Sequence, residues 1–326
     1  MQSGFKTRIG RVVPLLLVLA PVMALAACGS DTPSFTDQVR EIAEANSDEQ
    51  PAMWDVSDED TQIYLFGTVH TLRPETEWMT GRVSERIEAA KAIYFEADNE
   101  SQRARDGVEI AVTQHGLYNP GQSLRDVLDD EVEGEVAEAT ELVGVPLAGF
   151  DTFKPWLVSA TLSQMYAEEL GFDSEAGVET VLGDIARASN KPLRYLETGA
   201  DQMELLASIP DGDQIDMLVN TAGQILENPT QLDQMVAEWA EGDVDALSAL
   251  VAEDKTFGEG PAFDIMLKGR NANWTEQIVN LLETEEGVFF IAVGAAHLVG
   301  EESVQSMLGA RGLDVVRVDK RNEILR

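Results

Sequence analysis

The chain has 326 residues, of which 44% are apolar and 6% aromatic, which is enough for one large or two small domains with a substantial core. This composition excludes an intrinsically disordered chain and an integral membrane bundle. With 59 acidic and 23 basic residues, the formal net charge is −36, and such a surface repels phosphate backbones and argues against nucleic acid as a partner.

The first 28 residues have the order of a secretory leader. Basic residues precede an apolar stretch at 12–25, which is short for a membrane span. The sequence Leu-Ala-Ala-Cys (25–28) follows and resembles the lipobox of bacterial lipoproteins, in which the cysteine is acylated and the chain is cut before it. We therefore expect a signal peptide at 1–27 and a lipid such as palmitate on Cys28, the only cysteine. This places the protein in the cell envelope, attached to the membrane through the lipid alone. Gly29 after the cysteine indicates the outer membrane, facing the periplasm.

After an acidic tether at 28–51, the pattern predicts an α/β domain over 52–326. A strand at 62–66, a helix at 80–90 and a strand at 92–95 form a βαβ unit, whose strands should be parallel. Helical patterns interrupt the strands at about 100–190 and 201–285, which predicts a large helical insertion. The expected fold is therefore a central mixed, mainly parallel sheet with flanking helices. Further strands are expected at 192–196, 288–293 and 314–318.

Two of the three histidines follow an apolar strand and a glycine in the same local frame. Gly67 precedes His70, and Gly294 precedes His297, each with two residues between. A glycine at a strand end allows a sharp turn or the close approach of a ligand. Open α/β sheets bind ligands at this edge. One such histidine alone is more typical of an ordinary loop, but two in one frame favour a functional site.

Two carboxylates also follow predicted strands, Glu96 and Glu197. If the four strands are neighbours, both histidines and one or both carboxylates meet at one edge of the sheet. Two histidines and a carboxylate can bind a divalent ion such as Mn, Co or Zn and activate a water molecule. Arg270 can bind a substrate carboxylate or stabilise an oxyanion, and an ion pair with Glu96 or Glu197 is the alternative.

The chain resembles the TraB/GumN family, which includes bacterial pheromone-shutdown proteins and resembles the TIKI proteases of animals. The motifs that carry the resemblance are Tyr-Leu-Phe-Gly-Thr-Val-His (64–70), Tyr-Phe-Glu-Ala-Asp (94–98), Leu-Glu-Thr (196–198) with Gln202, Arg-Asn-x-x-Trp (270–274) and Val-Gly-Ala-Ala-His-Leu-Val-Gly (293–300). The resemblance implies a fold akin to the erythromycin-esterase and ChaN-like proteins, and a metal-dependent peptidase activity for the TIKI branch. The site that it implies comprises Gly67, His70, Glu96, Arg270, Asn271, Gly294 and His297.

These observations predict a metal-dependent hydrolase that acts on a peptide or small-molecule substrate. His70, His297 and Glu96 would hold the ion or act on its water, and Arg270 and Asn271 would position the scissile group. The remaining binding residues would be Gly67, Gly294, Glu197 and Gln202. The alternative is a non-catalytic protein that binds a peptide, or a haem-like ligand through two imidazoles, at the same edge. The oligomeric state is not specified by the sequence.

Overall fold

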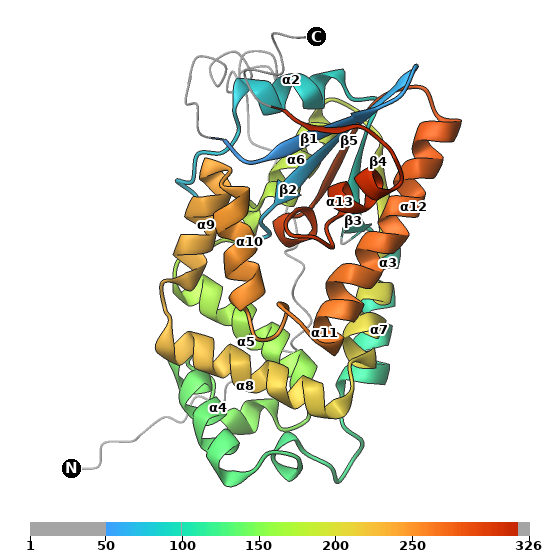
Figure 1. The fold of residues 1–326 in the computed structure, drawn as a ribbon. Coiled ribbons are helices and arrows are strands. Elements are labelled where there is room, and N and C mark those ends of the chain that lie inside the picture. Colours follow the sequence, from blue (N-terminus) through green and yellow to red (C-terminus); the bar gives the residue numbers. More distant parts are fainter. Residues whose placement is uncertain (1–49, 99, 319–326) are drawn as a thin grey trace, which may run out of the picture.

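The computed structural model describes residues 50–98 and 100–318, and these contain a six-stranded sheet in the order β4-β3-β5-β2-β1-β6 (Figure 1). The strands are β1 (Met53–Ser57), β2 (Thr61–Thr68), β3 (Ala92–Asp98), β4 (Leu193–Thr198), β5 (Gly287–Gly294) and β6 (Val315–Arg317). Strands β4, β3, β5 and β2 run parallel, whereas β1 is antiparallel to both β2 and β6. The predicted fold class, a mainly parallel mixed sheet with flanking helices, is confirmed.

The predicted βαβ unit is present, but its two strands are not adjacent. Strand β5 lies between β2 and β3 and pairs in parallel with both. Strand β1 was not predicted, because the polar Asp55 interrupts its short apolar run. It forms a hairpin with β2 through a turn in which Asp58 Oδ1 accepts hydrogen bonds from the backbone N–H groups of Asp60 and Thr61.

Helices occupy most of the chain between the strands. The longer ones are α2 (Gly81–Ala89), α3 (Gln102–Ala111), α4 (Asp130–Leu142), α5 (Pro155–Glu169), α6 (Val178–Ala188), α7 (Gly199–Ser208), α8 (Asp211–Glu227), α9 (Gln231–Glu241), α10 (Val244–Glu253), α12 (Gly269–Thr284) and α13 (Val304–Ala310). The shorter ones are η1 (Val112–Gly116), η2 (Leu124–Asp126), η3 (Leu147–Phe150), η4 (Ser174–Ala176), α11 (Pro261–Phe263), η5 (Asp264–Lys268) and η6 (Ala295–Leu298).

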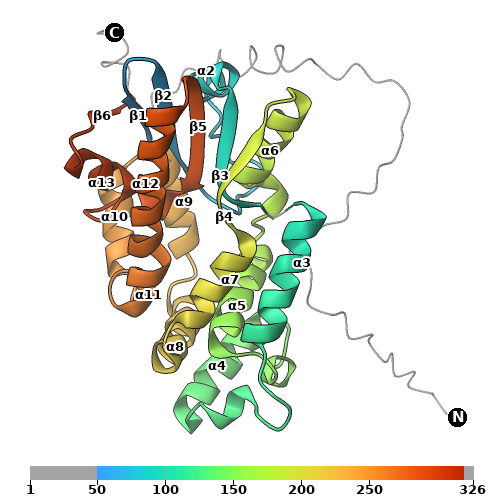
Figure 2. The ribbon, with the colours of Figure 1, turned by 90° about the vertical axis from the view of Figure 1, so that its right-hand side faces the viewer.

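Both faces of the sheet are covered, as a mainly parallel sheet requires. Residues of α2, α6, α9 and α10 form one apolar cluster with the sheet, in which Phe66 and Phe290 are fully buried. Helices α12 and α13 form the cluster on the other side, around Ile291 and Trp274 (Figure 2). The sheet is therefore a rigid layer that fixes where each strand ends.

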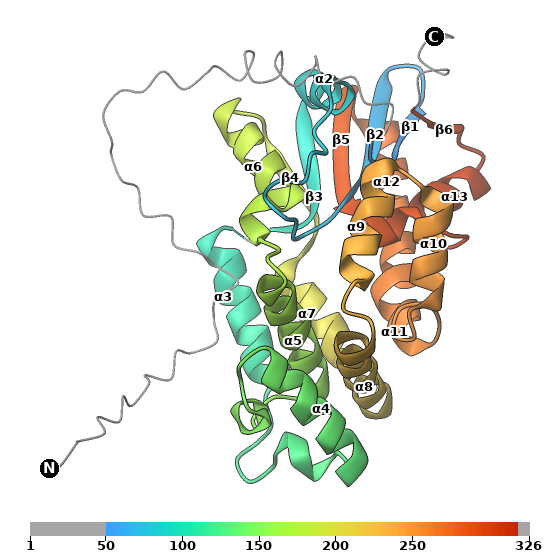
Figure 3. The same cartoon turned by 90° about the vertical axis from the view of Figure 1, so that its left-hand side faces the viewer.

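The helical insertion has its own apolar core and lies beyond the sheet. Helices α4, α5 and α8 pack around a cluster that includes Val136, Leu162 and Leu218. The views agree that α4 is far from the sheet and that α7 lies between the two parts (Figures 1 and 3). The carboxyl ends of the parallel strands point toward the insertion, so the predicted site lies where the two parts meet.

No helix within residues 50–98 and 100–318 combines the length and the apolar character needed to cross a membrane. The predicted signal peptide, Cys28 and nearly all of the tether lie outside the described residues. The lipid anchor and the position in the envelope therefore stay predictions.

Candidate functional site

The parallel strands bring the four predicted side chains to one edge of the sheet. Thr68 at the end of β2 is paired with Gly294 at the end of β5, and Ala97 in β3 is paired with Glu197 in β4. His70 follows β2, His297 lies in the short helix after β5, and Glu96 belongs to β3. The predicted convergence at the carboxyl ends is therefore confirmed.

Gly294 is the point where these groups come closest together. A Cβ atom added to it would lie 3.0 Å from Glu96 Oε1, 3.6 Å from His297 Cδ2 and 4.0 Å from His70 Nε2. Its own N–H donates to Glu96 Oε1 over 2.6 Å. The glycine allows this close approach, because an added Cβ would crowd Glu96 Oε1 and would lie between the carboxylate and the two imidazoles.

His70 is exposed and is held by a residue that the sequence analysis did not select. Its Nδ1 lies 2.8 Å from Oε1 of Glu179, in the first turn of α6, and its side chain is 71% exposed. The same oxygen accepts a hydrogen bond from Thr68 Oγ1 over 2.5 Å. His70 Nε2 is thereby left facing Gly294. The nearest sequence signal was Gly177, which starts the helix two residues before Glu179 and permits close contact with the loop.

His297 is buried, and both of its ring nitrogens have partners. Nε2 lies 3.0 Å from Arg270 Nη1, and Nδ1 lies 2.6 Å from Asn271 Oδ1. The guanidinium can only donate, so Nε2 accepts and the proton is on Nδ1. Asn271 is oriented in turn, since its amide nitrogen donates to the carbonyl of Glu302 over 2.7 Å. The ring of Trp274 lies 4.4 Å from the imidazole, between centroids.

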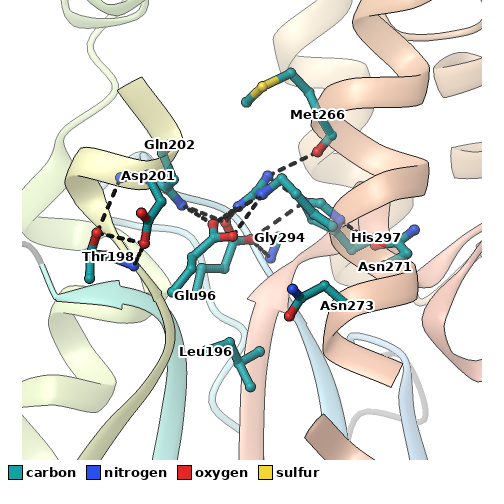
Figure 4. A network of polar contacts seen from close by, with 12 residues as sticks. Glu96, Leu196, Thr198, Asp201, Gln202, Met266, Asn271, Asn273, Gly294 and His297 are labelled. Atoms are coloured by element: carbon teal, nitrogen blue, oxygen red, sulfur yellow. Dashed lines mark hydrogen bonds and ion pairs between the residues drawn. The ribbon is translucent and has the colours of Figure 1, made fainter. Parts of the chain in front are cut away.

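Arg270 is the centre of a buried polar network, in which Glu96, Met266 and His297 are labelled in Figure 4. Its Nη2 donates to Glu96 and Glu197, each over 2.5 Å, and its Nε also donates to Glu197. Its Nη1 donates to the carbonyl of Met266 and to His297. All five N–H donors of the guanidinium are thus used within the protein. The alternative reading of Arg270, an ion pair with Glu96 and Glu197, is the arrangement present.

Gln202 and Gly67 also lie where the family motifs imply. Gln202, on α7, donates to Glu96 over 3.2 Å and to Glu197 over 2.8 Å, and joins the insertion to the network (Figure 4). Gly67 lies next to the loop after β5, because an added Cβ would be 3.2 Å from Ala295. Its carbonyl accepts a hydrogen bond from Trp239 over 2.9 Å. Both residues support the site and do not face Gly294.

The two histidines have opposite electrostatics. The charge of Glu179 is the main reason that the pKa of His70 is raised to about 9, although solvent around the exposed ring screens this attraction. Burial lowers the pKa of His297 to about 3, in spite of the nearby Glu96. His297 is therefore neutral at pH 7, and His70 is readily protonated.

The two acidic partners stay ionised although they are buried. Burial alone would raise the pKa of Glu96, but His297, Arg270 and His70 and the Gly294 N–H outweigh it and lower the pKa to about 2. Since His297 is itself neutral at pH 7, Arg270 and then protonated His70 are the cations that maintain this charge. Burial also opposes ionisation of Glu179, and His70 and Thr68 outweigh it, so the pKa of Glu179 is lowered.

The predicted metal ligands do not fit a divalent ion in this arrangement. His297 has no free ring nitrogen, and the cation between Glu96 and Glu197 is the guanidinium of Arg270. Within the described ranges no group of three His, Cys, Asp or Glu residues has the spacing to hold a metal ion. Both ring nitrogens of His297 are bonded within the protein. Of the two imidazoles, only that of His70 could therefore bind a haem iron.

The placement of Arg270 and Asn271 also differs from the predicted one. Both were expected to position the scissile group of a substrate. Arg270 has no N–H left for this purpose, and Asn271 holds the His297 ring through its side-chain oxygen. Both side chains are buried and use their polar atoms on neighbours within the protein.

Comparison with known proteins gives a family match over nearly all of the described residues. The profile of the TraB/PrgY/gumN family matches residues 52–317. The chain is similar to "Uncharacterized protein YbaP" of Escherichia coli (strain K12), with 24% identity over 246 residues, which cover 76% of this chain and 87% of that protein. The protein of the same description from Shigella flexneri is 24% identical over 245 residues, covering 75% and 87%. No solved structure matches the chain significantly.

Proposed function

The chain belongs to the TraB/PrgY/gumN family, and on this premise we propose that it is a hydrolase, acting on peptides, whose reaction takes place in front of Gly294. The observation that carries the proposal is that a free imidazole nitrogen, His70 Nε2, and a carboxylate oxygen, Glu96 Oε1, face the same space at a strand end. The proposal requires a water molecule to enter in front of residue 294, where the glycine adds no side chain between the two groups.

In the proposed reaction His70 transfers the proton. A water molecule in front of Gly294 gives a proton to Nε2 and attacks the carbonyl carbon of the scissile bond. The imidazolium then returns this proton to the leaving amine, so the ring ends as it began. Glu96 Oε1, which already accepts from Gly294 N–H, orients the water through its remaining lone pair.

The buried network supports this reaction from behind. Arg270 fixes Glu96, and His297 is held by Arg270 and Asn271 against the wall of the space. The residues that contact the substrate are thus held in place by hydrogen bonds to their neighbours. They need no reorganisation energy when the reaction takes place. A divalent metal stays a prediction from the sequence, and no step of the reaction is derived through it.

Gly294→Ala tests the proposal most directly. The added methyl group would occupy the space between Glu96 Oε1 and His70 Nε2, so hydrolysis of a peptide library should be lost while the fold is kept. Gly134→Ala is the matched control, because an added Cβ there meets no atom within 4 Å. Full activity of Gly294→Ala would reject the site.

The rival function, a binding protein without turnover, is decided by the same assay. Retention of a peptide without cleavage by the unmodified chain would favour it. Chelator and added Mn, Co or Zn form a further arm, in which we expect no change in rate. Activation by an ion would contradict this expectation and favour the metal-dependent reaction that the sequence predicts.

We also propose that the domain works in the cell envelope, attached through a lipid on Cys28. The basic, apolar and Leu-Ala-Ala-Cys segments of the leader support this. Labelling of cells with a radioactive fatty acid would detect the lipid, and Cys28→Ser should release the protein from the membrane fraction.

A further inference from the structure

We propose that Glu179, at the start of α6, is the positioning residue that sets the tautomer and the direction of His70. The inference rests on the proposed function, in which His70 Nε2 transfers the proton. It adds a residue from outside the sheet, more than a hundred positions after His70 in the sequence, and gives α6 a part in the site.

The hydrogen-bond geometry determines which nitrogen of His70 is free. Glu179 Oε1 accepts from Nδ1 at 2.8 Å, so the neutral ring carries its proton there. The lone pair is then on Nε2, the atom that faces the space in front of Gly294. An exposed imidazole without such a partner would divide between two tautomers and rotate about its side-chain bonds. A carboxylate that orients a histidine in this way is a common device at catalytic sites.

The backbone holds the two residues together independently of their side chains. Val178 N–H donates to the carbonyl of Val69 over 3.1 Å. Leu72 and Asp173 exchange two backbone hydrogen bonds of 3.1 and 2.8 Å. A Cβ on Gly177 would lie 2.0 Å from the carbonyl oxygen of His70, so only glycine allows this approach. The loop after β2 and the start of α6 therefore form one unit.

The carboxylate of Glu179 forms its ion pair with His70. Its Oε1 accepts from Thr68 and His70, and its Oε2 is buried without a hydrogen-bond partner. Among the described residues His70 is the only charged side chain that pairs with it. Glu96 and Glu197, in contrast, share the guanidinium of Arg270. A residue that orients a histidine needs a carboxylate that pairs with no other charged group and whose oxygen is fixed in position.

Three variants of the full-length chain test this role. Glu179→Met removes the acceptor at similar size, Glu179→Gln keeps an acceptor oxygen without charge, and the exposed Glu175→Gln is the control for charge alone. The tautomer is read from the imidazole ¹⁵N signals above the pKa of His70, which is practical because the chain has three histidines. The rate constant kcat and KM are measured on the peptide that the unmodified protein cleaves.

We expect His70 of the unmodified protein, Glu175→Gln and Glu179→Gln to be in the Nδ1–H form, and Glu179→Met to be a mixture. In Glu179→Met, kcat should fall by about 10²- to 10⁴-fold with little change in KM, and Glu179→Gln should recover part of this loss. An unchanged Nδ1–H tautomer or an unchanged kcat in Glu179→Met would overturn the inference. If the unmodified protein cleaves no peptide, the proposed function fails, while the tautomer still decides the role of Glu179.

Discussion

The two glycine–histidine motifs look alike in the sequence and end in opposite environments. His70 lies on the surface, 71% exposed, with one carboxylate partner and one free nitrogen. His297 is 5% exposed, and both of its nitrogens are bonded to α12. In the proposed reaction the first exchanges a proton, whereas the second stays neutral and holds its neighbours. A shared local pattern thus places two residues at one site without giving them one role.

The difference comes from what covers each loop. The loop after β2 is contacted by the start of α6, whereas the short helix after β5 lies beneath α12 and α13. Burial decides the charge of an imidazole more strongly than its position in a motif does. We therefore expect substitutions around His70 to affect the rate, and substitutions around His297 to affect stability.

The largest effect on stability is expected from Arg270→Met, which leaves Glu96 and Glu197 buried without their cation. Loss of one partner of a buried ion pair costs about 3–5 kcal/mol in the free energy of unfolding. Urea unfolding measures it. Arg187→Gln, which removes a half-exposed arginine paired with Glu100 and Asp184, is the control and should cost at most about 1 kcal/mol. Equal midpoints for the two variants would show that the network does not stabilise the fold.

His70→Gln should separate rate from stability. Removing the group that transfers the proton lowers kcat/KM by about 10²- to 10⁴-fold. The free energy of unfolding should fall by at most about 1 kcal/mol, because the ring is mostly in solvent and its attraction to Glu179 is screened. Kinetics and urea unfolding on one preparation check both. A variant that unfolds more easily and still turns over normally would contradict the assignment.

His297→Gln should affect the free energy of unfolding more than His70→Gln does and the rate less. Arg270 Nη1 and Asn271 Oδ1 would lose good partners, which costs about 1–3 kcal/mol of unfolding free energy. The rate should fall less than in His70→Gln, since the lost ring is not the proton carrier. If the rate instead falls by as much as in His70→Gln, both histidines take part in the chemistry.

The smallest effect is the pH dependence of kcat/KM. The base form of His70 is the deprotonated one, so activity should rise with pH and level off as pH passes the pKa, which Glu179 raises to about 9. Screening by solvent shifts this midpoint downward, toward the ordinary 6.5. Glu179→Gln should move it further in that direction, because the attraction that favours the protonated ring is removed. A midpoint that does not respond to Glu179→Gln would refute the pairing.

The residues at the edge of the sheet could be predicted from the sequence. The hydrogen bonds and ion pairs that hold these residues in place could not. The strand pattern and the two glycines were sufficient to predict that four side chains lie close together, because the carboxyl ends of parallel strands lie on the same side of a sheet. These side chains are His70, Glu96, Glu197 and His297. Three features required the packed chain. Glu179 is contributed by a distant helix, Asn271 Oδ1 is bonded to His297 Nδ1, and Arg270 pairs at once with Glu96, Glu197 and His297. Each depends on which side chains become buried together, which no local pattern specifies.

The position of β5 has a consequence for how the molecule is made. This strand is central in the sheet, yet it emerges from the ribosome near the end of synthesis, long after β2 and β3. Until it arrives, the inner edges of those two strands lack their neighbour and expose unpaired backbone groups. The sheet can therefore close only once nearly the whole chain is available. A polypeptide that stays open so late is well suited to export in an extended form, and one truncated before residue 287 should aggregate.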